Sequence, residues 1–242
     1  MKTTLAVNAF CDIGLVKPSN EDMILLHDEM FRDGKMQKVF SADDRVIIAL
    51  ADGVGGLNKG DAASEQVLKA LVDFLSVIPD DLTNVELRDV FETFTAETHA
   101  SLSIDMGSTL VGLFLYCGRL YRYHAGDSRI YRYRRGMLER LTVDHSLRES
   151  GGQKDAPSNI ITNAIGGGTS AFIEFAEIED PFFLKDIYLL SSDGMHDLVS
   201  SKEISSIIGK PNAAEILKDT ANKYGGKDNI SVIVININFK EK

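Results

Sequence analysis

Cysteine is scarce in this sequence: the 242 residues include only Cys11 and Cys117, and tryptophan is absent. Two cysteines cannot build a disulfide framework, and no Cys/His cluster has the ligand spacing of a zinc site. Apolar runs of membrane-spanning length are also missing, and Met1–Phe10 lack the apolar core and the cleavage site of a signal peptide. We therefore expect a cytoplasmic protein with no membrane partner.

Positive charge is scarce as well. The sequence has 26 Lys and Arg against 36 Asp and Glu, which gives a formal net charge of −10. Long-range repulsion would therefore oppose binding to nucleic acid at low salt. A stretch between residues 119 and 140 interleaves Arg with Tyr, but the outer faces of β-hairpins explain this spacing better than a nucleic-acid surface does. We expect no nucleic-acid partner and a monomer.

What the sequence has in quantity is short apolar runs with strand character. They predict nine strands, at Thr3–Phe10, Met23–Leu26, Val46–Ala51, Ser108–Tyr116, Leu120–Ala125, Ile130–Tyr133, Phe172–Ile178, Ile187–Leu190 and Ile230–Ile237. Low-complexity tracts and Pro/Gly-rich linkers are absent, so the chain is expected to form one domain over residues 1–242. Ser150–Asn159 is the only stretch typical of a long irregular loop.

Helices are expected at four places. Asp61–Ile78 is amphipathic, and a second helix carries Leu87 and Phe94 on its apolar face. Capping boxes are predicted where Thr83 precedes Glu86 and where Ser200 precedes Glu203, before a short helix near Ile204–Ile208. A last helix is expected from Pro211 to just before Gly225. Because strands and helices come in blocks, the pattern indicates an α+β fold with antiparallel sheets and helices outside them.

Acidic residues stand at the ends of several predicted strands. Two apolar runs stop at Asp52-Gly53 and at Asp193-Gly194, whereas Asp228 and Glu21-Asp22 directly precede strands. In antiparallel sheets, strands that leave at an acid and strands that enter at one bring these carboxylates to the same rim. Asp-Gly is also a common turn sequence, so each pair taken alone is explained by a turn.

Carboxylates gathered at one rim require positive charge between them. Two unit charges 4 Å apart repel by about 4 kcal/mol at an effective dielectric constant near 20. Mg²⁺ and Mn²⁺ prefer carboxylate, carbonyl and water oxygens, and Gly53 would let a backbone carbonyl approach such an ion. The acidic rim therefore predicts a divalent-cation site.

Seven short motifs, taken in order, carry a family resemblance. They are Asp12-Ile-Gly14 with Lys17-Pro-Ser-Asn20-Glu21-Asp22, Ala51-Asp52-Gly53-Val-Gly55-Gly56, Gly107-Ser108-Thr109, Ala125-Gly126-Asp127-Ser128-Arg129, Leu141-Thr-Val-Asp144-His145-Ser146, Ser192-Asp193-Gly194 and Lys227-Asp228-Asn229. Together they resemble the metal-dependent protein phosphatase family (protein phosphatase 2C, PPM) in its bacterial form. The resemblance implies a β-sandwich of two antiparallel sheets flanked by helices on both sides, with the metal centre at one end.

The resemblance also implies roles for the acidic residues. Asp52 would bridge two Mn²⁺ or Mg²⁺ ions, Glu21 and the carbonyl of Gly53 would complete one site, and Asp193 with Asp228 would hold the other. Asp22 would stand behind these ligands. Asp127 would bind a weaker third ion, although a polar turn between two strands also explains this residue.

The implied reaction is hydrolysis of phosphoserine and phosphothreonine in proteins, by in-line attack of a hydroxide that bridges two cations. The family usually has an Arg as its phosphate contact where this chain has Lys17, which keeps the charge but loses the two-pronged geometry; a solvated surface Lys is the alternative reading. Some relatives have a His where Val54 stands, and Val54 cannot donate a proton. His145 is interpreted as a structural residue.

A further departure lies between Ser146 and Ile160. Bacterial relatives have a longer flap there, and this chain is expected to have only a reduced flap loop at about residues 146–160. The implied partners are proteins that a Ser/Thr kinase has phosphorylated. Lys17, Val54 and the short flap leave open a non-catalytic phosphoprotein-binding module, and a phosphoesterase acting on small molecules is a further alternative.

Overall fold

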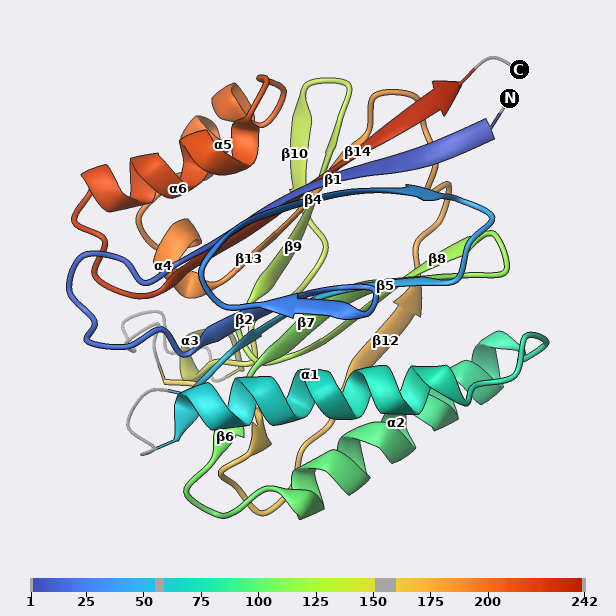
Figure 1. Ribbon diagram of the computed structural model, residues 1–242, viewed down its shortest axis with the longest axis vertical. Coiled ribbons are helices and arrows are strands. Elements are labelled where there is room, and N and C mark those ends of the chain that lie inside the picture. Colours follow the sequence, from blue (N-terminus) through green and yellow to red (C-terminus); the bar gives the residue numbers. More distant parts are fainter. Residues whose placement is uncertain (1, 55–58, 151–159, 241–242) are drawn as a thin grey trace.

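Two six-stranded antiparallel sheets face each other, and helices cover both outer sides (Figure 1). The computed structural model describes residues 2–54, 59–150 and 160–240. The predicted α+β class, with a central sandwich of antiparallel sheets and flanking helices, is confirmed. Within these ranges no helix is both long and apolar enough to cross a membrane.

Each sheet is built from strands that lie far apart in the sequence. Sheet I has the order β10 (Met137–Arg140), β9 (Arg129–Arg134), β13 (Ile187–Ser191), β14 (Ile230–Lys240), β1 (Lys2–Asp12) and β4 (Gly34–Ser41). Sheet II has the order β12 (Glu174–Glu177), β8 (Arg119–Ala125), β7 (Leu110–Tyr116), β5 (Val46–Asp52), β2 (Asp22–Leu26) and β3 (Glu29–Phe31). A small separate pair joins β11 (Ile165–Gly166) to β6 (Gly107–Ser108).

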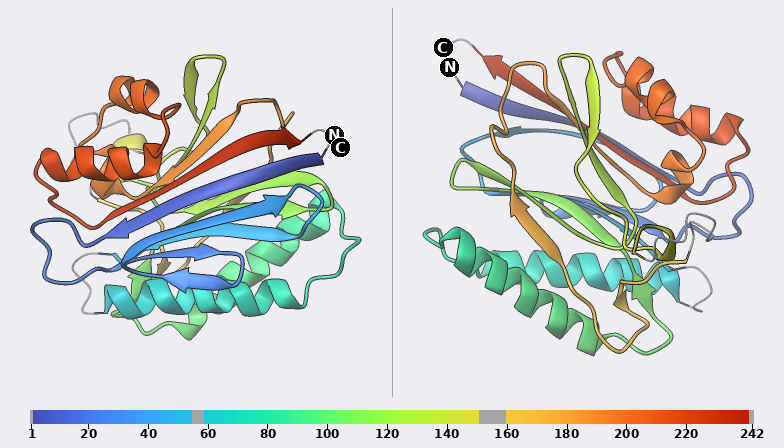
Figure 2. Two further views of the ribbon diagram at one scale, coloured as in Figure 1. Left: turned by 45° about the horizontal axis from the view of Figure 1, so that its top comes forward. Right: turned by 180° about the vertical axis from the view of Figure 1, so that it is seen from behind.

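The helices form two groups on opposite sides of the sandwich (Figure 2). Sheet II is covered by α1 (Gly60–Ser76) and α2 (Asn84–Ser101), and sheet I by α4 (Asp193–His196), α5 (Ser201–Ile207) and α6 (Ala213–Lys223). A single turn, α3 (Leu147–Ser150), lies apart from both groups. Both predicted capping boxes are present, at Thr83 with Glu86 and at Ser200 with Glu203.

Three apolar layers hold these elements together. One lies between sheet II and α1/α2, a second between the two sheets, and a third between sheet I and the C-terminal helices. The neighbouring residues Ile24 and Leu25 of β2 belong to different layers, since successive side chains of a strand point to opposite faces. Both faces of the central strands are therefore buried, which explains why these strands have continuous apolar sequences.

The differences from the predicted elements have local causes. β3, β4, β10 and β11 were not predicted, because they are very short or carry polar residues at partly exposed sheet edges. The last helix begins at Ala213 instead of Pro211, because Asn212 has a left-handed backbone (φ 58°) that a helix cannot contain. The loop predicted at Ser150–Asn159 and the flap lie largely outside the described residues.

Of the two cysteines, Cys11 is buried, but Cys117 is an exposed turn residue.

The arginine-rich stretch lies on β8, β9 and β10, as its spacing predicts. Most of these arginine side chains form salt bridges with acids of the same chain. Examples are Arg129 with Asp144, Arg134 with Asp186, and Arg132 with Glu139. Their charge is therefore largely neutralised within the fold, which supports the β-hairpin interpretation over a nucleic-acid surface.

Candidate metal centre

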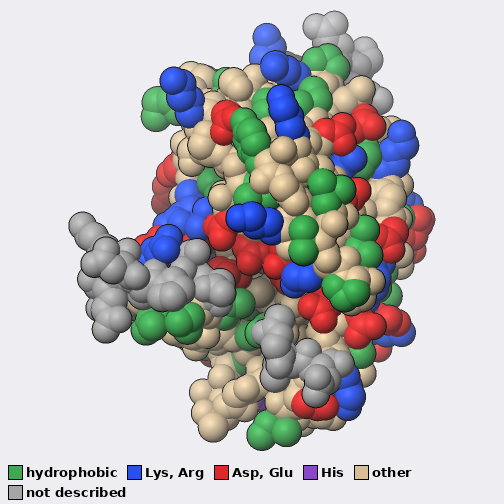
Figure 3. All heavy atoms as spheres, turned by 90° about the vertical axis from the view of Figure 1, so that its left-hand side faces the viewer, with side chains coloured by type: hydrophobic (Ala, Val, Ile, Leu, Met, Phe, Trp, Pro, Cys, Tyr) green, Lys and Arg blue, Asp and Glu red, His purple; other side chains and the backbone are tan. Residues whose placement is uncertain are grey.

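A hollow of about 480 Å³ opens at one end of the sandwich. Its lining includes four of the predicted acids and the predicted phosphate contact: Lys17, Asp52, Gly53, Val54, Asp127, Ile160, Ile161, Asp193 and Asp228. Figure 3 faces this end of the molecule and shows carboxylate side chains gathered near the middle of the face, with basic side chains beside them. We call this cavity the acidic hollow.

The acids come from both sheets. In sheet II, Asp22 at the start of β2 is the direct cross-strand neighbour of Asp52 at the end of β5. In sheet I, Asp193 follows β13 and Asp228 precedes β14, and these two strands are antiparallel neighbours. Asp127 lies in the connection from β8 of sheet II to β9 of sheet I. The hollow is therefore closed by strand ends from both layers of the sandwich.

Burial and mutual repulsion disfavour the ionised forms of these acids. Burial, followed by repulsion from neighbouring aspartates, raises the pKa of Asp52 and of Asp193 well above the usual range. Burial also raises the pKa of Asp22 and of Asp127 to about 6. Each of these carboxylates is thus more stable with a bound proton or a nearby cation than alone.

The glycine that follows each of two acids is needed for close packing. A Cβ at Gly53 would lie 2.4 Å from the backbone of Gly60, and a Cβ at Gly194 would lie 2.0 Å from the Asn229 carbonyl oxygen. Neither glycine has a positive φ. Asp52-Gly53 is therefore not a left-handed turn, and Asp193-Gly194 opens α4; both pairs bring backbone segments together at the hollow.

Asn229 fixes the loop that carries two predicted functional residues, a role that sequence analysis did not assign. Its Oδ1 accepts a hydrogen bond from the backbone N–H of Glu21 at 2.8 Å, and its Nδ2 donates to the carbonyls of Ile13 and Ser19 at 2.9 and 3.0 Å. The side chain is buried. Because Lys17 lies between the two carbonyl contacts, Asn229 positions both Glu21 and Lys17 relative to Asp228, its neighbour in sequence. The only sequence signal was its place in the Lys227-Asp228-Asn229 motif.

Asn229→Ala is therefore expected to weaken metal binding more than it weakens the fold. Residues that hold metal ligands in place typically change metal affinity by about 10- to 100-fold when they are replaced. We expect the Kd for Mn²⁺ to rise by at least about tenfold, measured by calorimetric titration of the apoprotein with Mn²⁺. The control is Asn238→Ala, at an exposed site on β14. An unchanged Mn²⁺ titration of Asn229→Ala would contradict the positioning role.

Asp22 is not part of the lining of the hollow, although it pairs across the strands with Asp52. It is fully buried, and its Oδ2 accepts a hydrogen bond from Ser192 Oγ at 2.8 Å. Its Oδ1 has no hydrogen-bond partner among the described residues. Ser192 also accepts a hydrogen bond from the backbone N–H of Ser231 at 2.9 Å, so this hydroxyl joins β2 to β14 across the two sheets. Ser192 belongs to the Ser192-Asp193-Gly194 motif, but no pattern in the sequence connects it to Asp22.

Lys17 is the only cation among the described residues that line the hollow. Its Nζ lies 2.7 Å from Asp228 Oδ1. Glu21 does not line the hollow directly, but its carboxylate packs against the start of α1, where a Cβ at Gly60 would lie 2.9 Å from it. Burial is also the main cause that raises the pKa of Glu21.

His145 supports the turn that carries Asp127. Its Nδ1 accepts hydrogen bonds from the Gly126 backbone N–H at 3.1 Å and from Asn163 Nδ2 at 2.8 Å. The ring is buried and does not line the hollow. The structural interpretation of His145 therefore agrees with its position.

The donor set of the hollow fits divalent cations. Several buried carboxylates with raised pKa values surround a cavity whose described lining offers only one positive side chain. One oxygen of Asp22 has no hydrogen-bond partner within the described part of the chain. Hard cations such as Mg²⁺ and Mn²⁺ bind oxygen ligands of this kind. Asp52, Asp193, Asp228, Asp127, Glu21 and the Gly53 carbonyl are the groups that could hold them.

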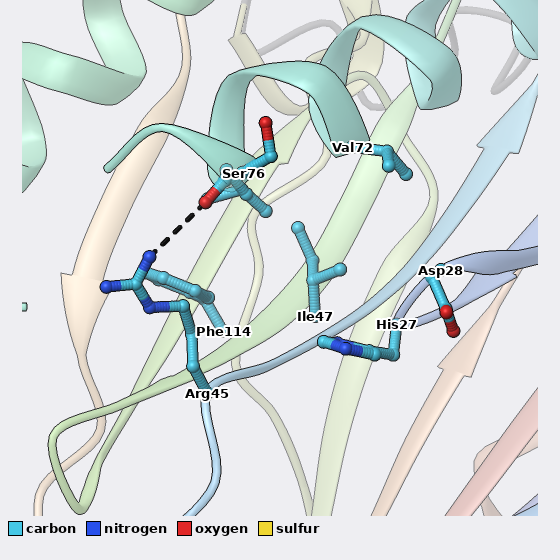
Figure 4. Close-up of a pocket in the computed structure, with 8 residues that line it drawn as sticks. His27, Asp28, Arg45, Ile47, Val72, Ser76 and Phe114 are labelled. Atoms are coloured by element: carbon cyan, nitrogen blue, oxygen red, sulfur yellow. Dashed lines mark hydrogen bonds between the residues drawn. The ribbon is translucent and has the colours of Figure 1, made fainter. Parts of the chain in front are cut away.

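A second cavity, of about 330 Å³, has a different character (Figure 4). It lies at the other ends of β2, β5 and α1, and Ile47, Leu75 and Phe114 form an apolar floor. Arg45 at its edge donates a hydrogen bond to the Leu75 carbonyl. With one carboxylate, Asp28, in its lining, this cavity is not a candidate metal centre.

Comparisons with known proteins extend over nearly the whole chain. No protein-family model matches it. The chain is 30% identical over 223 residues to the serine/threonine phosphatase stp of Listeria monocytogenes, covering 83% of this chain and 88% of that protein. It is 26% identical to protein phosphatase PhpP of Streptococcus pneumoniae, covering 98% and 99%. The solved catalytic domain of serine threonine protein phosphatase PstP, in complex with 2 manganese ions, is similar with a TM-score of 0.74 and 28% identity, covering 98% of this chain and 100% of that one.

Proposed function

Because the chain belongs to the bacterial PPM (protein phosphatase 2C) family of serine/threonine phosphatases, we propose that it removes phosphate from phosphoserine and phosphothreonine side chains of proteins. The observation that carries this proposal is the acidic hollow, where buried carboxylates from both sheets meet beside one lysine. A net charge of −10 does not prevent binding of phosphate there, because cations held by the carboxylates would set the local field.

We assign the ligands that line the hollow by their position and by resemblance to the family, and Glu21 by resemblance alone. Asp52 would be shared by two cations, with Glu21 and the Gly53 carbonyl completing one site. Asp193 and Asp228 would complete the other. Asp127 would contribute to a third, weaker site, and Asp22 would support the ligands through its contact with Ser192.

Mn²⁺ or Mg²⁺ would serve as the cation, since both prefer oxygen ligands. Bound divalent cations neutralise phosphate charge and lower the pKa of water, which is the chemistry that hydrolysis of a phosphate ester needs. The substrates we propose are proteins phosphorylated by a Ser/Thr kinase, because the family acts on phosphoproteins.

The chain's own residues would bind and orient the substrate. Lys17 would change its partner from Asp228 to a phosphate oxygen, as a point charge without the two-pronged geometry of Arg. Val54 lines the hollow but has no proton to donate to the departing side-chain oxygen. Protonation of that oxygen would therefore come from another group or from solvent.

Lys17→Ala is expected to raise KM for a phosphopeptide by about 10- to 150-fold, because a hydrogen bond to a charged group contributes about 1.5–3 kcal/mol. Lys17→Arg should restore binding, since Arg keeps the charge and adds a second donor. Steady-state kinetics with Mn²⁺ would measure both variants. Equal KM values for wild type and Lys17→Ala would show that Lys17 does not contact the phosphate.

The test of the function itself is an assay of the purified protein with Mn²⁺ or Mg²⁺, p-nitrophenyl phosphate and phosphopeptides. Release of phosphate that EDTA abolishes is the expected result. Phosphopeptide binding without release would instead favour the non-catalytic binding module, for which Lys17, Val54 and the short flap are the specific arguments. Faster hydrolysis of phosphorylated metabolites than of phosphoproteins would favour the small-molecule phosphoesterase.

A further inference from the structure

A second, smaller groove adjoins the acidic hollow. It has a volume of about 160 Å³ and shares two lining residues, Val54 and Ile161, with the hollow. The rest of its wall comes from Gly107 of β6 and from the segment Thr162–Ser170 that contains β11. Any group held in this flanking groove is therefore next to a group held at the acidic centre.

The chemistry of the flanking groove differs from that of the hollow. None of the described residues that line it is charged; the wall consists of Val, Ile and Ala side chains, a few neutral polar groups and glycine backbone. A charged side chain buried there would find no oppositely charged partner among the described lining residues. A compact, uncharged side chain would bury apolar area favourably against Val54 and Ile161.

The wall of the groove is held in place by hydrogen bonds. The Val54 N–H donates to the Gly107 carbonyl at 2.9 Å, and Gly166 pairs with Gly107 across the β11–β6 pair. The Gly166 N–H also donates to His99 Nδ1 at 2.9 Å. Asn163 is fixed by two hydrogen bonds with the backbone of Phe172, at 2.9 and 3.1 Å. The groove is therefore formed before any ligand binds, which lowers the cost of binding.

We propose that the flanking groove binds the side chain of the substrate residue next to the phosphorylated Ser or Thr, and that it selects compact uncharged residues over charged ones. This inference rests on the proposed phosphatase function. Continuity with the acidic hollow through Val54 and Ile161 identifies the occupant as part of the same substrate. The volume of about 160 Å³ is below the roughly 300 Å³ of typical small-molecule sites, which suits one side chain better than a separate ligand.

Gly168 offers a way to fill the groove without disturbing the metal centre. Among the described residues, a Cβ at this position would come within 4 Å only of the Ser170 carbonyl oxygen, at 3.8 Å, and the φ of Gly168 is not in the left-handed region. Gly166 and Gly167 are unsuitable, because both have a positive φ. Gly209 is the matched control: it lies between α5 and α6, a Cβ there meets nothing within 4 Å, and its φ is also ordinary.

The experiment compares phosphopeptides that carry Val, Glu or Lys beside the phosphorylated residue, with p-nitrophenyl phosphate as a substrate that has no flanking residue. For wild type with Mn²⁺ we expect kcat/KM for the Val peptide to exceed that for the charged peptides by at least about tenfold. Gly168→Phe should lower kcat/KM for the Val peptide by at least about tenfold and leave p-nitrophenyl phosphate hydrolysis within about twofold. Gly209→Phe should change neither.

Gly168→Glu adds a test that general structural damage cannot imitate, because its carboxylate should shift the preference toward the Lys peptide. Wild-type hydrolysis of all three peptides at equal rates, or equal losses of peptide and p-nitrophenyl phosphate activity in Gly168→Phe, would overturn the groove proposal alone. Absence of any EDTA-sensitive hydrolysis by wild type would overturn the proposed function. In that case the Val, Glu and Lys phosphopeptides would be labelled, and their Kd values would be measured by fluorescence anisotropy with Mn²⁺. Tighter binding of the Val peptide would support the groove's preference for an uncharged side chain, and equal Kd values would overturn it.

Discussion

Asp193→Asn is expected to lower kcat for phosphopeptide hydrolysis by at least about 100-fold at saturating Mn²⁺. The substitution keeps the size of the side chain but removes the negative charge that would hold a cation between the two sheets. Metal ions contribute several kcal/mol to catalysis of this kind, and each 1.36 kcal/mol is a factor of ten in rate. Stopped assays of phosphate release at several Mn²⁺ concentrations would measure the loss and show whether more metal restores activity.

The matched control for this prediction is Asp81→Asn, which makes the same chemical change at an exposed site between α1 and α2. It should keep wild-type kcat. Asp228→Ala should behave like Asp193→Asn, because Asp228 reaches the hollow from the neighbouring strand of sheet I. Wild-type turnover in either Asp193→Asn or Asp228→Ala would contradict the metal-ligand assignment.

Asp193→Asn is also expected to raise the melting temperature of the protein in EDTA at pH 8. Burial and nearby aspartates raise the pKa of Asp193 well above the usual range. The folded state therefore holds a proton that the unfolded state has lost, and stability falls as the pH rises from the unfolded pKa of about 4 through the folded pKa. The free energy of unfolding of the variant does not carry this loss, so its advantage over wild type should grow from pH 5 to pH 8.

Comparing the two proteins at each pH removes the effects of ionisable groups that Asp193 does not perturb. Asp52 is not such a group, because Asp193 helps to raise its pKa, so the difference reports the relief of repulsion at both aspartates. Burial lowers the pKa of His124 to about 4 and that of His196 well below its usual range, so these histidines destabilise the fold as the pH falls. They are present in both proteins and cancel in the difference. One kcal/mol corresponds to roughly 2–4 °C in Tm for a chain of this size, so a stability difference of that size is large enough to measure.

Mn²⁺ should reverse this order. A ligand at 100 times its Kd stabilises the fold by about 2.7 kcal/mol, and wild type has the complete set of carboxylates. Differential scanning fluorimetry with EDTA and with Mn²⁺, at pH 5, 6.5 and 8, would measure all conditions. If Asp193→Asn were less stable than wild type in EDTA at pH 8, the prediction that burial and repulsion at Asp193 destabilise the metal-free fold would be wrong.

Much of the fold could be predicted because its central strands have both faces buried. Val46–Ala51 and Ile187–Leu190 are continuous apolar runs within two of these strands, so the strands stand out from the polar segments around them. The capping residues Thr83 and Ser200 mark helix starts through local chemistry alone. In contrast, β4 at the edge of sheet I alternates polar and half-buried residues, so its sequence does not distinguish it from a loop.

The roles of side chains that act across the two sheets could not be predicted. Asn229 contacts Glu21 from a position 208 residues away, and Ser192 contacts Asp22 from 170 residues away. No periodicity or spacing connects such positions. The flanking groove is a similar case, because Val54 and Ile161 become neighbours only where the two cavities meet.

The sequence by itself determined the class of the fold and the acids at the strand ends, because each acid directly follows or precedes an apolar run and a strand end must lie at a sheet rim. It also carried the resemblance from which the family was predicted. Only the tertiary structure decided that the rim is made from two sheets, with Asp22 and Asp52 in one and Asp193 and Asp228 in the other. The reason is physical: local sequence specifies which residues form a strand, whereas burial of apolar faces between sheets specifies which strand ends meet.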